Sequence, residues 1–465
     1  PAEFGRNEMT HQKVAIIGAG IAGLSSAYYL QKNSPETQIL IFESEGETGG
    51  KLATSPFAGV SVDEGADSFL VRVPWAVELC RDLGLEAELV SPSARTASLW
   101  IDGKLQQIPS PNVLGVPLEI ESIGDGLLTP DALSRLNSNG VPSLDLPNSD
   151  ASVGQVIRSC VGSEVLERLV DPLIGGINAG RADEMSCAVM APQLLEASHH
   201  PDGMLSRLKD LAKNADPTAP VFHAHPEGMS RLVDVLTKSL GNSFNMVSPV
   251  LNISRLGNKW VIETERGRES VDGVVIATPA SVSSNILEKT LPGPAQVFKA
   301  IEFASVALVT FGYSRTDFEA DSSQSGFLVP RSSQLFMTAC SYSASKWAHL
   351  RHPELEILRV STGRIDDDRH VTMTDDELVS ELRLDLNSTL GIESVPVDVR
   401  VTRWPNSLPQ FPVGHADQMN ALDDELSHSA PGVFFAGAIR HGVGIPACIR
   451  SGKEAAQQLS EFLYR

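Results

Sequence analysis

Near its start the chain carries Val14-Ala15-Ile16-Ile17-Gly18-Ala19-Gly20-Ile21-Ala22-Gly23-Leu24, in which a short apolar run leads into the pattern G-x-G-x-x-G. This order predicts a strand, a tight turn and a helix, as in a dinucleotide-binding βαβ unit. Gly18 permits the turn, Gly20 lets the backbone approach a pyrophosphate, and Gly23 lets helix and strand pack closely. We therefore expect residues 18–23 to bind phosphates at the start of the helix, where free N–H groups and the positive dipole end lie.

An acidic residue follows at the spacing that this fingerprint predicts. The apolar strand expected over residues 38–42 ends at Glu43, 20 residues after Gly23. An acidic residue at that place accepts hydrogen bonds from the adenosine ribose. Glu43 therefore favours FAD or NAD, which have a free ribose 2′-OH, over NADP. The alternative is a solvated glutamate at a strand end.

Two further glycine-rich stretches distinguish FAD from NAD. Gly49-Gly50-Lys51 predicts a second close approach of backbone to cofactor, with Lys51 facing a phosphate. Near the C-terminus an apolar strand over 432–437 leads to Gly442-Val443-Gly444-Ile445-Pro446, which opens a final helix. The start of that helix would favour negative charge on a reduced flavin. Together these features predict FAD, bound by both ends of the chain.

Composition sets the class of protein. The 465 residues carry a formal net charge of −21, with 42% hydrophobic and 20% charged residues, which excludes a nucleic-acid surface and suggests two or three domains. No apolar run approaches the ~18–20 residues of a transmembrane segment. Five widely spaced cysteines without a C-x-x-C motif favour reduced thiols and a cytoplasmic protein. No metal site is predicted, because Cys and His do not cluster at ligand spacing.

Residues 171–181 contain three glycines in an apolar setting. One interpretation is backbone that lies against a flat ligand, which would place Gly176 and Ile177 at the substrate. The other interpretation is a sharp turn between helices. The sequence favours neither.

The chain resembles, over nearly its whole length, the flavin-dependent porphyrinogen oxidases of haem biosynthesis, within the amine oxidase and phytoene desaturase superfamily. Its C-terminal motif is typical of the bacterial, Gram-positive-type branch. The motifs that carry the resemblance are 18–24 with Glu43, 49–51, 65–70, 171–180, 225–228, Arg403-Trp404 with 408–411, and 442–449.

The resemblance implies an α/β fold with a discontinuous Rossmann-like FAD-binding domain, a mixed-sheet substrate domain and an inserted α-helical domain that touches membranes in relatives. The boundaries that we expect are 10–75, 221–285 and 396–465 for the FAD-binding domain, 76–95 and 286–395 for the substrate domain, and 96–220 for the inserted domain. The FAD contacts that it implies are Gly18, Ala19, Gly20, Ile21, Ala22, Gly23, Glu43, Lys51, Gly65, Ala66, Asp67, Ser68, Val250, Trp404, Val443, Gly444 and Ile445.

The resemblance also implies the reaction. A porphyrinogen would lose six electrons to the flavin in three two-electron steps, and dioxygen would reoxidise the flavin and form hydrogen peroxide. Coproporphyrinogen III is the expected substrate in this branch, and protoporphyrinogen IX is the alternative. Transient contact with the next haem-pathway enzyme and peripheral contact with a membrane are further expectations.

No side chain is predicted to be catalytic, because the sequence shows no triad or paired carboxylates and the flavin carries the chemistry. A substrate with four propionates does need local cations in so acidic a protein. The candidates are Arg72, Arg95 and Arg440, each adjacent to a motif expected near the pocket. For each, the alternative is a solvated surface arginine. The family's acidic residue before G-V-G-I-P is replaced here by His441.

Two other functions use a similar scaffold. A flavin amine oxidase or carotenoid desaturase would share the FAD motifs, and amine oxidases often tether the flavin through a cysteine. Cys448, just inside the last helix, is the residue in question here, and a packed thiol is the simpler interpretation. A non-catalytic tetrapyrrole-binding protein is the third possibility, which the complete set of flavin-contact motifs disfavours.

Overall fold

The computed structural model describes residues 12–142, 145–213, 216 and 219–464. The N-terminal fingerprint forms strand β1 (Lys13–Ile17), a glycine turn, helix α1 (Ile21–Asn33) and strand β2 (Gln38–Phe42), as the sequence predicts. Residues 14–17 of β1 are fully or almost fully buried, which is typical of a central parallel strand covered on both faces.

A parallel five-stranded sheet in the order β11-β2-β1-β15-β21 collects strands from distant parts of the chain. Next to β1 and β2 lie β11 (Phe244–Asn245), β15 (Gly273–Ile276) and β21 (Val433–Phe435). Val14 and Ile16 pack toward the core that holds α1, α10 (Ser230–Leu240) and α17 (Ile445–Leu463).

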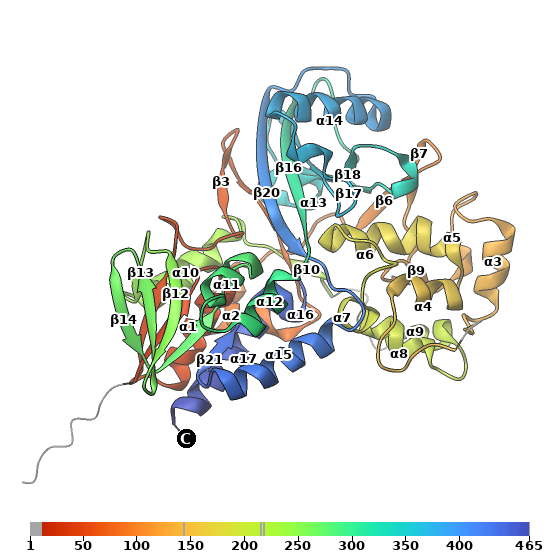
Figure 1. Cartoon of the computed structure of the whole chain (residues 1–465). Coiled ribbons are helices and arrows are strands. Elements are labelled where there is room, and N and C mark those ends of the chain that lie inside the picture. The colour runs from red at the N-terminus through yellow and green to blue at the C-terminus, as the bar shows by residue number, and fades with distance from the viewer. Residues whose placement is uncertain (1–11, 143–144, 214–215, 217–218, 465) are drawn as a thin grey trace, which may run out of the picture.

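The opposite face of this sheet, which carries Ala15 and Ile17, packs against a second core. It is built by a small antiparallel sheet and three helices (Figure 1). These elements are β12 (Val250–Leu256), β13 (Lys259–Thr264), β14 (Gly267–Val271), α11 (Ala280–Leu287), α12 (Pro292–Lys299) and α15 (His415–Ser429).

A second large sheet has seven strands in the order β20-β16-β19-β18-β17-β6-β7. Its pairs are antiparallel except β17 with β6. One face packs on α14 (Asp375–Leu390), whose start carries the capping box of Thr374 and Glu377. The strands are β6 (Thr96–Ile101), β7 (Lys104–Gln107), β16 (Phe303–Ser314), β17 (Gln324–Leu328), β18 (Met337–Tyr342), β19 (Leu355–Thr362) and β20 (Asp398–Pro409).

A third region is mainly helical and has a core of its own. It occupies the right of Figure 1. None of the helices in the described part of the chain is long and apolar enough to span a membrane. The helices are α3 (Pro130–Asn137), α4 (Val153–Cys160), α5 (Ser163–Val165), α6 (Asp171–Asn178), α7 (Cys187–Met190), α8 (Pro192–Ser198) and α9 (Met204–Lys213).

The strand pairing crosses the expected segment boundaries at two places. The hairpin β6–β7 lies within the segment 96–220, which we expected to form the inserted domain, but it extends the seven-stranded sheet because β6 pairs with β17. Strand β20, which we expected with the FAD-binding segments, pairs along β16 in the same sheet. Residues 171–178 form helix α6 and so are not a sharp turn. The two boundary crossings arise from long-range strand pairing, which local sequence patterns do not specify.

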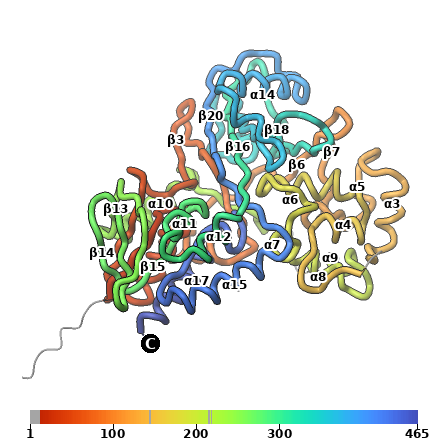
Figure 2. Tube along the Cα trace, in the orientation of Figure 1, coloured from red at the N-terminus to blue at the C-terminus, as the bar shows by residue number. Residues whose placement is uncertain are grey.

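The first and last parts of the described chain lie together (Figure 2), and α1 packs against α17. Gly452 of α17 allows this approach, because a Cβ atom there would lie 2.4 Å from the carbonyl oxygen of Ala22. Gly23 similarly has no room for a side chain, since its Cβ would lie 1.9 Å from the carbonyl oxygen of Gly18. The glycine turn, α1 and α17 are therefore packed backbone against backbone.

We expect Gly452→Val to destabilise the protein by about 1–3 kcal/mol or more, because the new methyl groups overfill the contact between α1 and α17. Chemical denaturation with circular dichroism measures this change. Gly124→Val is the matched control, since Gly124 is exposed and a Cβ atom added there would have no neighbour within 4 Å. Equal stability of the two variants would contradict this account of the packing.

Candidate active site

A cavity of about 910 Å³ lies between the parallel sheet, the seven-stranded sheet and α6. Its volume is near the top of the roughly 300–1,000 Å³ that is usual for small-molecule sites. At one end lie the carboxyl ends of β1, β2 and β15, where open α/β sheets bind ligands. At the other end lie α6 and residues of β16, β18 and β19.

The glycine turns leave open backbone at the end of the cavity beside β1, β2 and β15. We call it the nucleotide end, because the sequence predicts a dinucleotide there. A Cβ atom on Gly20 would meet no atom within 4 Å, although this residue lines the cavity. The second glycine loop lies directly beside the first, since the Gly49 amide donates to the carbonyl oxygen of Ala19 at 2.8 Å. Gly18 has a φ of +100°, which favours glycine in this turn. The two loops form a surface that can accept a pyrophosphate along bare backbone.

The Glu43 carboxylate is held in place at the end of β2. Its Oε2 accepts a hydrogen bond from the Ala19 amide at 2.7 Å, and its Oε1 accepts one from the Glu45 amide at 3.0 Å. Glu43 lines the cavity beside the glycine turn. The remaining lone pairs can accept hydrogen bonds from the hydroxyls of a ribose.

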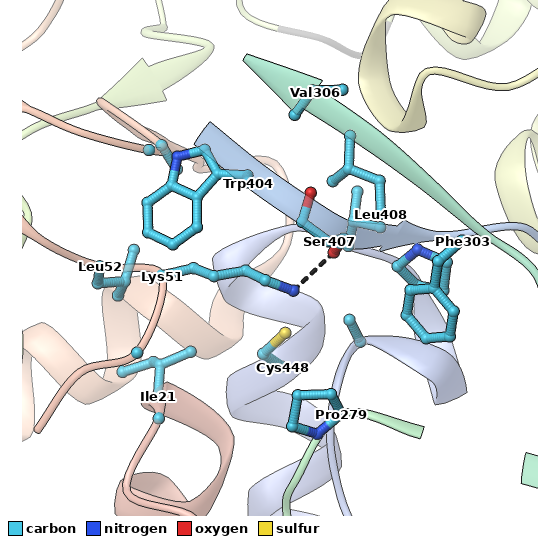
Figure 3. Close-up of a pocket in the computed structure, with 18 of the residues that line it drawn as sticks. Ile21, Lys51, Leu52, Pro279, Phe303, Val306, Trp404, Ser407, Leu408 and Cys448 are labelled. Atoms are coloured by element: carbon cyan, nitrogen blue, oxygen red, sulfur yellow. Dashed lines mark hydrogen bonds between the residues drawn. The ribbon is translucent and has the colours of Figure 1, made fainter. Parts of the chain in front are cut away.

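Lys51 extends into the middle of the cavity (Figure 3). Its ammonium donates to the carbonyl oxygen of Ser407 at 2.6 Å, and Cys448 of α17 lies nearby. Burial lowers the pKa of the Lys51 ammonium. Burial is also the main reason why the pKa of the Cys448 thiol is raised to about 11. Cys448 is therefore a protonated, poorly nucleophilic thiol at neutral pH.

Asp67 joins the nucleotide end to the seven-stranded sheet. Burial would raise its pKa, but Lys346 and Arg359 hold the pKa well below its usual range. The Lys346 ammonium lies 2.9 Å and the Arg359 guanidinium 3.2 Å from Asp67 Oδ2. Arg359 also donates to the carbonyl oxygen of Gly65 at 2.6 Å. This cluster fixes the backbone of residues 65–67 along the cavity wall.

The start of α17 forms another part of the wall, through Val443, Gly444 and Ile445. A polar clamp holds the preceding turn, because Glu454 accepts hydrogen bonds from His441 at 2.5 Å and from Arg450 at 2.7 Å. The first amides of this 19-residue helix give its start a positive partial charge.

The wall opposite the nucleotide loops is largely apolar. This wall is formed by Phe303, Val306 and Leu308 of β16, together with Gly176 and Ile177 of α6. Gly176 is exposed, and a Cβ atom added to it would have no neighbour within 4 Å. The next residue, Ile177, is 47% exposed. The α6 backbone therefore borders open space in the cavity, as one of the two interpretations of this stretch requires.

The cavity collects most of the residues that we predicted from the sequence. Ala19, Gly23 and Ser68 do not line it, and they support their neighbours instead. For example, Ser68 donates to Asp67 at 2.9 Å. The predicted residues that line the cavity are Gly18, Gly20, Ile21, Ala22, Glu43, Lys51, Gly65, Ala66, Asp67, Gly176, Ile177, Val250, Trp404, Val443, Gly444 and Ile445.

The three predicted substrate arginines lie outside the cavity lining. Arg72 and Arg95 are exposed. Arg440 forms two hydrogen bonds with Asp423, at 2.7 and 2.5 Å, and its guanidinium lies over the Phe435 ring. Proximity in sequence to a cavity motif thus did not place these three side chains in the cavity lining.

The family model for flavin-containing amine oxidoreductases matches residues 21–460. The chain belongs to this family. It is 30% identical over 466 residues to the coproporphyrinogen III oxidase of Staphylococcus aureus, covering 96% of this chain and 99% of the relative. It is 28% identical to the chloroplastic protoporphyrinogen oxidase of Oryza sativa, with coverage of 96% and 88%. The crystal structure of a candidate protoporphyrinogen oxidase from Exiguobacterium sp. 255-15 superposes with a TM-score of 0.88, 28% identity and coverage of 97% and 99%.

Membership of this family makes the protein a flavin-dependent oxidoreductase, and the cavity fits a flavin nucleotide. Bare glycine backbone and the carboxylate of Glu43 lie at the nucleotide end. The positive end of α17 lies in the same cavity, where it would favour negative charge on the flavin ring.

Several lining residues were missed by the sequence analysis. Thr278 and Pro279 follow β15, and their position could have been predicted, because ligands bind at the carboxyl ends of parallel strands. Arg331, Arg364 and Lys346 have no such signal. Arg331 and Arg364 follow β17 and β19 of the seven-stranded sheet, and Lys346 ends the short helix α13 (Ser343–Lys346).

The clamp at Glu454 should make stability depend on pH. Burial would raise its pKa, but the hydrogen bonds from His441 and Arg450 lower it from 4.5 to about 2. The carboxylate therefore stabilises the fold above pH 4.5, and this contribution is lost as the pH falls toward 2.

We expect Glu454→Gln to melt at a lower temperature than the parent at pH 7, and this difference to shrink between pH 4.5 and 2. Thermal melts at a series of pH values measure it. Glu461→Gln, which changes an exposed carboxylate on the same helix, is the control and should show no such difference. A difference that stays constant with pH would argue against the clamp.

Proposed function

We propose that this protein is an FAD-dependent oxidase that converts coproporphyrinogen III into coproporphyrin III. Six electrons and six protons would pass to three molecules of dioxygen, which would give three molecules of hydrogen peroxide. The observation that carries the proposal is that one continuous cavity joins the glycine turns and Glu43 to an apolar wall formed by residues of β16. Full-length similarity to enzymes named coproporphyrinogen III oxidase supports the choice of substrate.

The flavin that we propose is FAD, which would lie along the cavity with its adenosine end at β1 and β2. Residues 18–23 and the start of α1 would bind the pyrophosphate, and Glu43 would bind the ribose. Residues 65–67, Val250, Trp404 and 443–445 would border the rest of the cofactor. When bound, the flavin would accept electrons from the substrate and pass them to dioxygen.

The chain's own part in the reaction would be to bind, orient and exclude water. The apolar residues of β16 and the open α6 backbone would face a flat macrocycle. No acid or base is assigned, because the cofactor carries the electron transfer. The start of α17 would favour negative charge on the cofactor, which would assist its reduction.

A Gly20→Val variant tests the nucleotide end. The added side chain would project into the cavity and keep the pyrophosphate away from the backbone. We expect flavin affinity to fall at least about tenfold, which corresponds to ~1.4 kcal/mol. Absorbance of the flavin bound per chain measures the loss.

Gly46→Val is the matched control, because Gly46 is exposed, lies outside the cavity lining and would have no neighbour within 4 Å of an added Cβ atom. It should retain its flavin. Normal flavin content in Gly20→Val would contradict the proposed position of the pyrophosphate.

Porphyrin fluorescence tests the substrate. We expect a higher kcat/KM for coproporphyrinogen III, which carries four carboxylates, than for protoporphyrinogen IX, which carries two. A reversed preference would support the alternative suggested by the rice relative. Failure of any porphyrinogen to bleach the bound flavin without oxygen would contradict the proposed activity, and turnover of amines instead would indicate an amine oxidase.

A further inference from the structure

Among the described residues, four cationic side chains line the cavity: Lys51, Arg331, Lys346 and Arg364. Three of them have strong partners in the protein. Lys346 is paired with Asp67 at 2.9 Å, Arg331 with Asp171 at 3.2 Å and also with Asp366, and Lys51 donates to a backbone carbonyl group. Their charges or donors are therefore largely satisfied without a ligand.

Arg364 differs from these three. Its Nη2 donates to the carbonyl oxygen of Val329 at 2.6 Å. Among the described residues, no carboxylate oxygen lies within 4.0 Å of a guanidinium nitrogen of Arg364, so this arginine forms no ion pair there. The other guanidinium N–H groups have no protein partner in the described chain, yet they are not sealed from the cavity. The side chain thus presents unused donors of a fixed positive charge to the cavity.

The surroundings make this charge costly without a counterion. Arg364 is half-buried, and burial is the main cause that lowers its pKa, with a further contribution from Arg331. The nearby carboxylates of Asp171, Asp366 and Asp367 offset this charge only in part. Each of them is paired with another arginine, since Asp171 and Asp366 pair with Arg331 and Asp367 pairs with Arg369. A half-buried cation without a paired anion favours an anionic ligand.

Two hydroxyl groups in the same wall could add donors. Thr338 and Ser361 both line the cavity, and their hydroxyl oxygens lie 2.7 Å apart in a shared hydrogen bond. They belong to neighbouring strands β18 and β19, and Arg364 follows β19. Planar guanidinium groups bind carboxylates through two parallel hydrogen bonds.

We propose that Arg364 forms a carboxylate subsite of the cavity and binds a peripheral propionate of the substrate, at the wall formed by β18, β19 and α6. This inference rests on the proposed function, since it requires a substrate that carries carboxylates. It replaces the exposed Arg72 and Arg95 and the internally paired Arg440 with an arginine that lines the cavity. An overall charge of −21 makes such a local cation necessary for a polyanionic ligand.

The test uses the flavin-loaded enzyme and Arg364→Gln, whose side-chain amide can still donate to Val329. We expect the Kd for coproporphyrin III, measured by quenching of protein and porphyrin fluorescence, to rise about 10- to 100-fold. The KM for coproporphyrinogen III should rise similarly with little change in kcat. Affinity for the coproporphyrin tetramethyl ester, which has no carboxylates, should not change between the two proteins.

Arg266→Ala is the control variant. It removes an exposed arginine that does not line the cavity, and it should bind coproporphyrin III as the parent does. Bound flavin and melting temperature report whether Arg364→Gln folds. If that variant does not fold, Arg364→Lys, which keeps the charge but loses the planar guanidinium group, replaces it in the same binding and kinetic assays. Unchanged coproporphyrin affinity in the folded variant overturns the subsite alone. Loss of flavin from a folded variant also overturns it, because the arginine would then serve the cofactor. A parent enzyme that neither binds coproporphyrin III nor oxidises its porphyrinogen overturns the proposed function, and the subsite with it.

Discussion

The close contact between α1 and α17 is the constraint on which the rest of the structure depends. It brings a helix that starts at residue 21 against one that ends at residue 463. Gly452 makes this possible because any side chain there would strike the backbone of α1. As a result the glycine turn after β1 and the start of α17 open into the same cavity, so that the positive ends of two helices lie at one cavity.

A second constraint fixes the two large sheets relative to each other. Asp67 lies in a loop that follows the small hairpin β3 (Thr54–Phe57) and β4 (Val60–Asp63), and its cationic partners come from the region of the seven-stranded sheet. Breaking a buried pair of this kind costs more than the pair contributes, because it leaves an uncompensated charge. The position of the cavity wall is therefore determined by a small number of charged groups as well as by apolar packing.

Much of the local structure was predictable because short-range interactions determine it. The fingerprint gave β1, the turn and α1. The turn of the hairpin β6–β7 is likewise local, because Asp102 and Gly103 both have positive φ there. Strand pairing over long distances was not predictable in the same way. The hairpin and β20 look like ordinary strands in sequence, and only their partners place them in the seven-stranded sheet.

By itself the sequence determined the strand, glycine turn and helix of the first unit and the place of Glu43 at the end of β2, since these are properties of one continuous βαβ unit. Full-length similarity then identified the family. The tertiary structure decided which cations face the cavity. Arg72, Arg95 and Arg440 lie next to cavity motifs and yet line no part of it, whereas Arg364 follows a strand of the other sheet and does. The physical reason is that a local pattern specifies backbone conformation, whereas the direction and partners of a long charged side chain depend on everything packed around it.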